Sequence, residues 1–175
     1  MSSINAGFKK AGVVSVISII LLWLIVPVAN AKEVIGWVEN ALILPQKIMI
    51  KAKIDTGAKS SSLHCDCIDK FRRDGEQWVR FSLTDSDDKH YTIEKKVVRT
   101  VKIKRHFGDV QKRDVVRMGI CVSGHYEETD VSLIDRSGFN YSLLIGRRYL
   151  QDNFIVDPSV SFTVNPHCEL QSDNP

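Results

Sequence analysis

The 175-residue sequence has no excess of charge of either sign. Once the first 31 residues are set aside, 22 basic residues face 21 acidic ones, a formal charge of +1. Such a balance creates no general electrostatic attraction to nucleic acid or to anionic membranes. We therefore expect no nucleic-acid partner.

Several motifs that would reveal a reaction are also missing. The sequence contains no G-x-S-x-G elbow, no phosphate-cradling glycine loop, no H-E-x-x-H helix and no C-x₂-C pair. His64, Cys65 and Cys67 are the nearest candidate for zinc, but they lack a recognisable fourth ligand. We therefore predict no cofactor and no metal ion.

Long amphipathic helices are absent after residue 31, and short alternating apolar segments take their place. Strands are predicted over residues 34–39, 47–55, 78–83, 96–103, 110–120, 131–134 and 161–164. We expect a hairpin turn at Gly108-Asp109 and one helix of two turns over residues 147–153. Many short strands with one short C-terminal helix predict an all-β domain over residues 32–175, a small closed or nearly closed β-barrel.

The one long hydrophobic run lies at the start, over residues 11–28. It follows Lys9 and Lys10 and precedes an A-x-A pattern at Ala29 and Ala31, as in an export signal. Eighteen residues are also the lower limit for crossing a bilayer, so a retained N-terminal membrane anchor is the alternative. Both interpretations of residues 1–31 place the remainder in the periplasm, with membrane contact only through residues 11–28 if the leader is retained.

Four cysteines, an even number, lie in the part predicted to be exported: Cys65, Cys67, Cys121 and Cys168. An oxidising compartment favours disulfides. Three complete pairings are possible, and Cys65 with Cys67 is the least favoured because one intervening residue strains the bridge. The sequence leaves the number open between none and two.

The most informative segment is Ile54-Asp55-Thr56-Gly57-Ala58, which places a carboxylate on a tight turn at the end of an apolar strand. About ninety residues later comes a second apolar run, Leu143-Leu144-Ile145-Gly146, followed by Arg147. A carboxylate in such a turn can accept hydrogen bonds from nearby Thr and Gly groups and can activate water. The commonest role of Asp-x-Gly is a turn aspartate that only accepts backbone hydrogen bonds, and the second run is what favours a functional carboxylate.

Together the two segments resemble the signature of retropepsin-like aspartic proteases. The resemblance is closest to a bacterial branch labelled ATP-dependent zinc proteases, some of them encoded near ATP-grasp ligases. It extends over residues 35–39, 52–64, 78–81, 144–147 and 156–158. It implies an acid-protease barrel that hydrolyses peptide bonds in a peptide or protein substrate.

The resemblance makes Asp55 the catalytic residue. Two aspartates about 3 Å apart share a proton, so that one acts as base and the other as acid. Because the sequence holds one Asp-Thr-Gly, the second must come from a homodimer.

Around this carboxylate, Thr56 would join the two active-site loops, Gly57 would permit close approach and Ala58 would line the floor. Leu144, Ile145 and Gly146 would support the loop from behind, with Arg147 beside them.

Two positions depart from the retroviral pattern. Lys59 occupies the place of an acidic residue that helps to hold the substrate, and the candidate flap, residues 104–113, contains only Gly108. Arg99 and Arg113 are expected to form ordinary surface salt bridges. The alternatives are a non-catalytic periplasmic peptide-binding module on the same fold, and a zinc-dependent or isopeptide amidohydrolase of the cell envelope.

Overall fold

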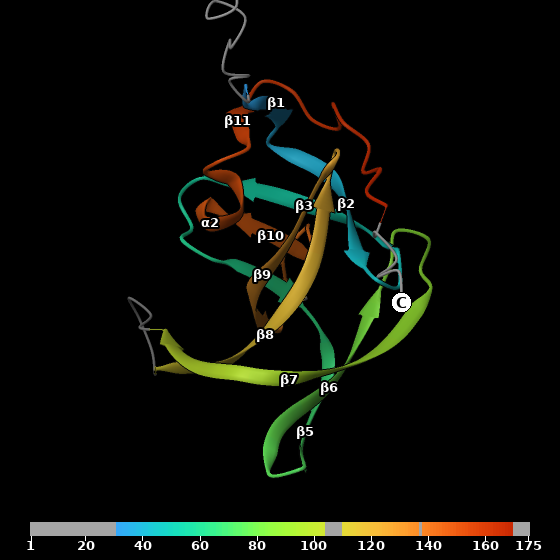
Figure 1. Ribbon diagram of the computed structural model, residues 1–175, viewed down its shortest axis with the longest axis vertical. Coiled ribbons are helices and arrows are strands. Elements are labelled where there is room, and N and C mark those ends of the chain that lie inside the picture. Colours follow the sequence, from blue (N-terminus) through green and yellow to red (C-terminus); the bar gives the residue numbers. More distant parts are fainter. Residues whose placement is uncertain (1–30, 104–109, 137, 170–175) are drawn as a thin grey trace, which may run out of the picture. The chain divides into compact units, whose positions relative to one another are not determined.

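The computed structural model describes residues 31–103, 110–136 and 138–169 (Figure 1). The predicted leader, the turn at Gly108-Asp109 and most of the candidate flap lie outside these ranges. The described elements belong to one compact unit that begins at Lys32. Within the described residues, no helix is long and apolar enough to cross a membrane.

The described residues form eleven strands and one short helix. They are β1 (Glu33–Gly36), β2 (Val38–Leu44), β3 (Ile48–Asp55), β4 (Ser61–His64), β5 (Asp66–Arg73), β6 (Glu76–Thr84), β7 (His90–Ile103), β8 (Gln111–Val122), β9 (His125–Ile134), β10 (Leu143–Gly146), α2 (Arg147–Leu150) and β11 (Phe154–Asp157).

Six of these strands close into a barrel in the order β2, β3, β10, β4, β9 and β8, and β8 pairs again with β2. The sheet continues beyond β8 through β7 and β6 to β5, while β1 and β11 form a separate parallel pair. Figure 1 shows the β5–β6 hairpin extending away from the barrel. The prediction of an all-β barrel with one short helix is confirmed.

The barrel forms because its strands alternate apolar and polar side chains, which a strand sends to opposite faces. In β3, Ile48, Ile50 and Ile54 are buried, whereas Lys51 is exposed and Lys53 is partly exposed. Each fully buried aliphatic side chain contributes about 1.5–3 kcal/mol. This pattern places Asp55 at the last position of a strand anchored in the core.

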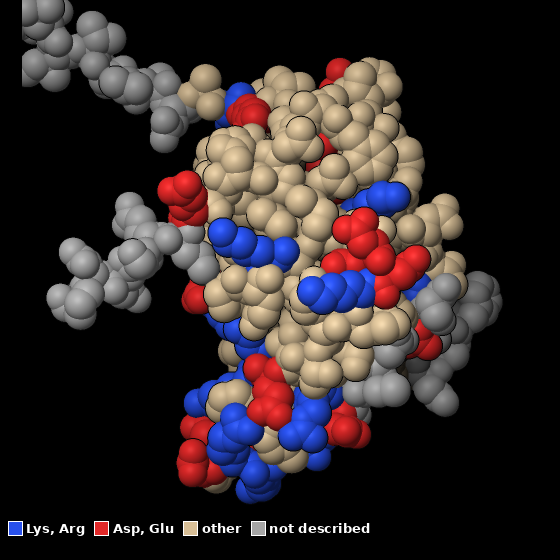
Figure 2. All heavy atoms as spheres, turned by 90° about the vertical axis from the view of Figure 1, so that its right-hand side faces the viewer, with Lys and Arg blue, Asp and Glu red and all other residues tan. Residues whose placement is uncertain are grey.

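The projecting hairpin is a charged surface. Figure 2 shows basic and acidic side chains crowded together at this end of the described unit. They are joined by ion pairs of Arg73 and Arg80 with Glu94, and of Lys96 with Glu76. The residues that the sequence predicted to form the active site lie in the barrel and not on this hairpin.

Several predicted elements were wrong in extent. The strand predicted over residues 34–39 is two strands, because the strand pairing is interrupted at Trp37. The helix predicted over residues 147–153 ends at Leu150, since Phe154 leaves it to pair with Glu33. Residues 161–164 form no strand; their amides bond to the Glu39 carboxylate and to Val38 instead of a sheet edge.

One disulfide is present among the described residues, between Cys121 at the end of β8 and Cys168 near the C-terminus. Cys65 is buried below the barrel wall. The bridge closes a loop of 47 residues and ties the C-terminal segment to the barrel.

Candidate active site

Asp55 lies where β3 runs parallel to β10. In this pairing Ile54 is opposite Ile145 and Asp55 is opposite Gly146. The two segments singled out in the sequence, some ninety residues apart, are therefore neighbours in the barrel wall. The structure brings the candidate catalytic carboxylate and the candidate supporting turn together.

The Asp55 side chain folds back over its own turn. Its Oδ1 atom accepts hydrogen bonds from the backbone amides of Gly57 at 2.9 Å and Ala58 at 3.1 Å. Among the described residues, none donates a hydrogen bond to Oδ2. One oxygen is therefore held by the loop, as it would be in any turn aspartate, while the other is left for a further partner.

Arg147 holds the loop from the far side. Its guanidinium Nη1 atom donates to the carbonyl oxygens of Thr56 at 2.8 Å and Gly57 at 3.0 Å. Its backbone amide donates to the Ala58 carbonyl at 2.9 Å. One residue at the start of α2 therefore binds three consecutive carbonyl groups of the Asp55 loop.

Gly146 allows this packing because a side chain there would collide with the loop. A Cβ atom at Gly146 would lie 2.7–2.9 Å from the backbone of Ser60. The Gly146 amide also donates a hydrogen bond to Ser61 Oγ at 3.2 Å. Leu144 and Ile145 are buried beside it, as a supporting turn requires.

The tip of the loop faces outward. Thr56 and Gly57 are exposed, and Ala58 is partly exposed. The roles predicted for these residues in a dimer stay predictions.

A groove of about 430 Å³ adjoins the Asp55 loop. Its polar lining includes Lys59, Arg99, Arg113, Asp130 and Arg136. Arg99 forms the predicted salt bridge, with Asp130, and both Arg99 and Arg113 also line this groove. The arginines face the groove because β7 and β8 extend past the barrel rim and form one wall.

A second hollow, of about 310 Å³, lies on the other side of Arg136 and Leu144. Asp55 itself lines it, together with Lys53 and the aromatic residues Trp37, Phe139 and Tyr141. Trp37 and Tyr141 meet edge to face, with ring centroids 5.9 Å apart. The candidate carboxylate thus lines the aromatic hollow, while the residues that follow it, from Ala58 to Ser60, line the basic groove.

Arg136 is the residue that sequence reasoning missed. It lines both hollows and is only 8% exposed. Its Nη1 donates to Ser62 Oγ at 3.0 Å, and its guanidinium stacks on Phe139 at 4.4 Å from the ring centroid. Burial lowers the pKa of Arg136, while the charge of Asp55 acts in the opposite direction. The sequence held no signal for it because its loop has no periodic pattern.

The zinc candidates have other contacts. His64 Nδ1 accepts a hydrogen bond from the backbone amide of Arg136 at 2.8 Å and lies 3.8 Å from Asp135. In the described part of the chain, no group of three or more histidine, cysteine or acidic side chains is arranged to hold a metal ion. His64 positions the loop that carries Arg136.

The family described as RimB-like, the retropepsin-like aspartic endopeptidase RimB, matches residues 34–167. This chain belongs to the RimB-like family. The match includes the Asp55 loop, β10 and most of the C-terminal segment, and it ends one residue before Cys168. It confirms the resemblance to retropepsin-like proteases.

A solved structure has a similar fold. It is the crystal structure of Lpg0085 from Legionella pneumophila, described as a protein with unknown function, which is 35% identical. The two superimpose with a TM-score of 0.66 over 76% of this chain and 98% of that one.

Curated relatives have a different name. Probable alpha-L-glutamate ligases from Shewanella halifaxensis and Shewanella pealeana are 35% and 36% identical over 125 residues. The match covers 70% of this chain but 27% of each ligase. This chain therefore spans about a quarter of the length of those relatives, and a RimB-like segment occurs within larger proteins named as ligases.

Proposed function

We propose that this RimB-like chain is an exported aspartic endopeptidase that works as a homodimer. The observation that carries the proposal is the Asp55 carboxylate, with one oxygen held by two backbone amides and the side chain lining a hollow. Family membership supports the reaction class. Asp55 is the catalytic residue in this mechanism.

The chemistry requires two copies of Asp55. A lone carboxylate with a pKa of ~3.9 is a weak base near neutral pH, whereas a facing pair shares one proton. The ionised member removes a proton from water as the water attacks the peptide carbonyl, and the protonated member donates to the developing oxyanion. The nitrogen then takes up a proton as the carbon–nitrogen bond breaks.

The exposed loop tip supports a dimer. Thr56 and Gly57 are exposed immediately beside Asp55, and a two-fold axis at the tip would bring the same residues of two chains together. Arg147 and Gly146 hold each loop rigid from its own side. The loops can therefore meet without rearranging.

The groove favours a substrate with acidic side chains. Arg99, Arg113 and Arg136 line it, and Asp130 is the single carboxylate among the described lining residues. Guanidinium groups bind carboxylates with charge-assisted hydrogen bonds. The names of the curated relatives, which concern glutamate, agree with a substrate peptide rich in glutamate.

The decisive experiment replaces Asp55 with Asn in the full chain. Cleavage of a glutamate-rich peptide library is expected to fall by at least about 10³-fold, since the base and acid are both lost. Asp69→Asn, an exposed aspartate of β5, is the matched control and keeps full activity.

Binding separates the alternatives. If wild-type protein binds peptides but cleaves none between pH 4 and pH 7, and Asp55→Asn binds equally well, the chain is a peptide-binding module. If an isopeptide-linked substrate is cleaved and linear peptides are not, the amidohydrolase alternative holds.

A further inference from the structure

The C-terminal strap, residues 158–168, is a segment that the proposed mechanism does not use. It belongs to no strand, but it runs beside Trp37, the residue that separates β1 from β2. The Trp37 amide donates to the Val160 carbonyl at 3.1 Å, and the Phe162 amide donates to the Val38 carbonyl at 2.8 Å. The strap therefore forms hydrogen bonds with Trp37, between the two strands, and with Val38, the first residue of β2.

A buried carboxylate anchors the middle of the strap. Glu39 is 0% exposed, and its Oε1 accepts hydrogen bonds from Thr163 Oγ1 at 2.6 Å, Gly36 N at 2.7 Å and Thr163 N at 3.0 Å. Its Oε2 accepts from the Val164 amide at 3.2 Å. A buried carboxylate is tolerated only when it accepts hydrogen bonds in this way. The strap therefore supplies donors to Glu39, and Glu39 in turn holds the strap in place.

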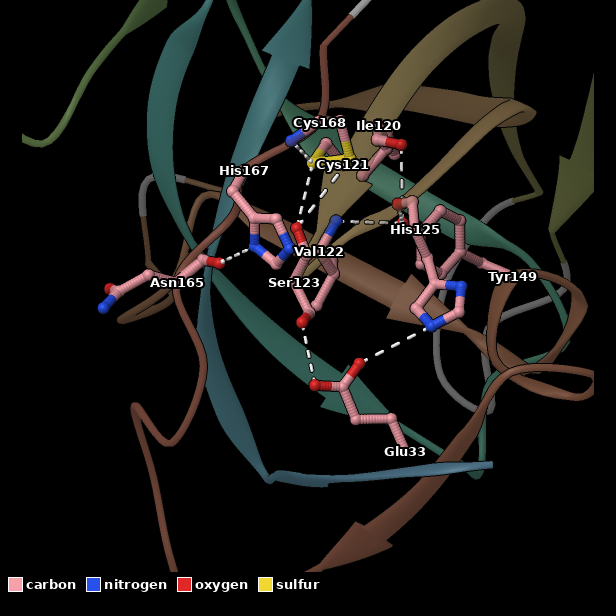
Figure 3. The surroundings of a disulfide bond; sticks show 10 residues. All are labelled: Glu33, Ile120, Cys121, Val122, Ser123, His125, Tyr149, Asn165, His167 and Cys168. Carbon is pink, nitrogen blue, oxygen red and sulfur yellow. Dashed lines mark hydrogen bonds and ion pairs between the residues drawn. A yellow bond between two sulfur atoms is a disulfide. The ribbon is translucent and has the colours of Figure 1, made fainter. Parts of the chain in front are cut away.

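The disulfide anchors the end of the strap (Figure 3). Cys168 is joined to Cys121 at the end of β8, and the His167 amide donates to the Ser123 carbonyl at 2.8 Å. Cys121 is fully buried, whereas Cys168 is partly exposed. Of the two cysteines, Cys168 is therefore the one closer to solvent.

Trp37 also connects the strap to the active site. The Trp37 carbonyl accepts a hydrogen bond from the amide of Ile54 at 2.9 Å, one residue before Asp55. The Trp37 ring lines the same hollow as Asp55. A Cβ atom on Gly36 would lie 2.5 Å from the Val160 carbonyl oxygen, so the strap sits against this backbone with no room to spare.

We propose that the C-terminal strap positions Trp37 and the Asp55 loop, and that the Cys121–Cys168 bond makes this positioning depend on redox conditions. Trp37 is a positioning residue in this scheme. The dependence of activity rests on the proposed peptidase function, whereas the positioning does not.

The redox step is an ordinary dithiol exchange. A small dithiol attacks Cys168 Sγ, the bond to Cys121 Sγ breaks, and the second thiol of the reagent displaces Cys168. The dithiol is oxidised to its cyclic disulfide, and Cys121 and Cys168 each take up one electron and one proton. No covalent bond then ties the end of the strap to β8.

The test compares the oxidised full chain with the chain reduced by dithiothreitol, below its unfolding temperature. Reduction is expected to lower kcat/KM by about 10- to 100-fold, mainly through kcat, because a small displacement near the reacting groups is costly. Cys168→Ser is expected to show the reduced level of activity with or without dithiothreitol. Equal kcat/KM in the oxidised and reduced chains would overturn the redox dependence.

A structural readout separates this proposal from the peptidase proposal. In the full chain carrying Trp23→Phe and Trp78→Phe, Trp37 is the remaining tryptophan. Reduction is expected to shift Trp37 emission to the red and to speed amide exchange at Trp37 and Ile54, even if no peptide is cleaved. Unchanged emission and exchange would refute the dependence of the positioning on the disulfide.

Glu39→Gln provides a second route that leaves the disulfide intact. The NH₂ group of the glutamine would face a backbone N–H group of the strap, and two donors cannot form a hydrogen bond. The strap is therefore expected to loosen in the oxidised chain. Its Trp37 emission should resemble that of the reduced chain. Emission matching the oxidised wild type, with native circular dichroism, would count against the proposal.

Discussion

Gly146 lies opposite Asp55 in the parallel pairing of β10 and β3. The Asp55 carboxylate is therefore positioned by a residue without a side chain, because any Cβ there would meet the Ser60 backbone at 2.7–2.9 Å. The sheet brings the turn close, and the glycine lets the loop pass across it. This relationship makes the geometry of the loop sensitive to single substitutions remote from any substrate.

Gly146→Ala tests this sensitivity. The added methyl group must push the Ser60 backbone away, which is expected to cost about 1–3 kcal/mol of unfolding free energy. Peptide cleavage is expected to fall more than stability alone explains. Gly138→Ala, where the structure shows nothing within 4 Å of the new Cβ, is the control. Equal melting temperatures for the two variants would show that the close approach is not required.

Arg147→Met removes the hydrogen bonds to the Thr56 and Gly57 carbonyls but keeps the helical backbone. Loss of these charge-assisted bonds is expected to cost about 1–3 kcal/mol and to reduce kcat with a smaller change in KM. Arg148→Met, the next residue of α2, is the matched control because only its backbone bonds to the loop. Steady-state kinetics on both variants decide the point.

Arg136→Met tests the preference for acidic substrates. Without the buried guanidinium, kcat/KM for glutamate-rich peptides is expected to fall about 10- to 100-fold, the value of one charge-assisted contact. Cleavage of neutral peptides should fall much less. Arg72→Met, on the exposed β5 strand, should leave both unchanged. If acidic and neutral peptides lose equally, Arg136 serves the fold and does not select the substrate.

Asp130 predicts a pH dependence of stability. Burial raises the pKa of Asp130, but hydrogen bonds from Arg99 and Arg117 outweigh it and hold that pKa below its ordinary value. A carboxylate with a depressed folded-state pKa stabilises the fold above its unfolded pKa and loses this contribution as the pH falls. Wild-type protein is therefore expected to lose more stability than Asp130→Asn between roughly pH 5 and pH 2. Denaturant unfolding at several pH values measures the difference, and parallel curves would contradict it.

Local sequence patterns were sufficient for the fold class and for the position of the candidate carboxylate. Alternation in residues 47–55 predicted β3 and placed Asp55 at its end, as observed. The run from Leu143 to Gly146 was correctly expected to lie beside the Asp55 loop. The first signal is local, since side chains in a strand alternate whatever the strand pairs with. The second came from the resemblance to retropepsin-like proteases, because β10 is buried along its whole length and does not alternate.

Elements without such patterns were missed. The strands β4, β5 and β11 have no clear alternation, and residues 161–164 alternate without forming a strand. Their conformations depend on partners distant in the chain, such as Glu39 for Thr163 and Glu33 for Phe154. The same holds for the pairing of Cys121 with Cys168, which the sequence left open.

By itself, the sequence determined an all-β barrel and a carboxylate on a threonine-glycine turn, because both follow from residue types over a few neighbouring positions. Tertiary structure alone decided that Arg136 lies between two hollows beside Asp55, and that the strap held by Glu39 bonds to Trp37, which in turn bonds to the active-site strand. These contacts join residues separated by 80 or more positions. Chain closure over such distances is set by the whole barrel, so no local pattern in the sequence records it.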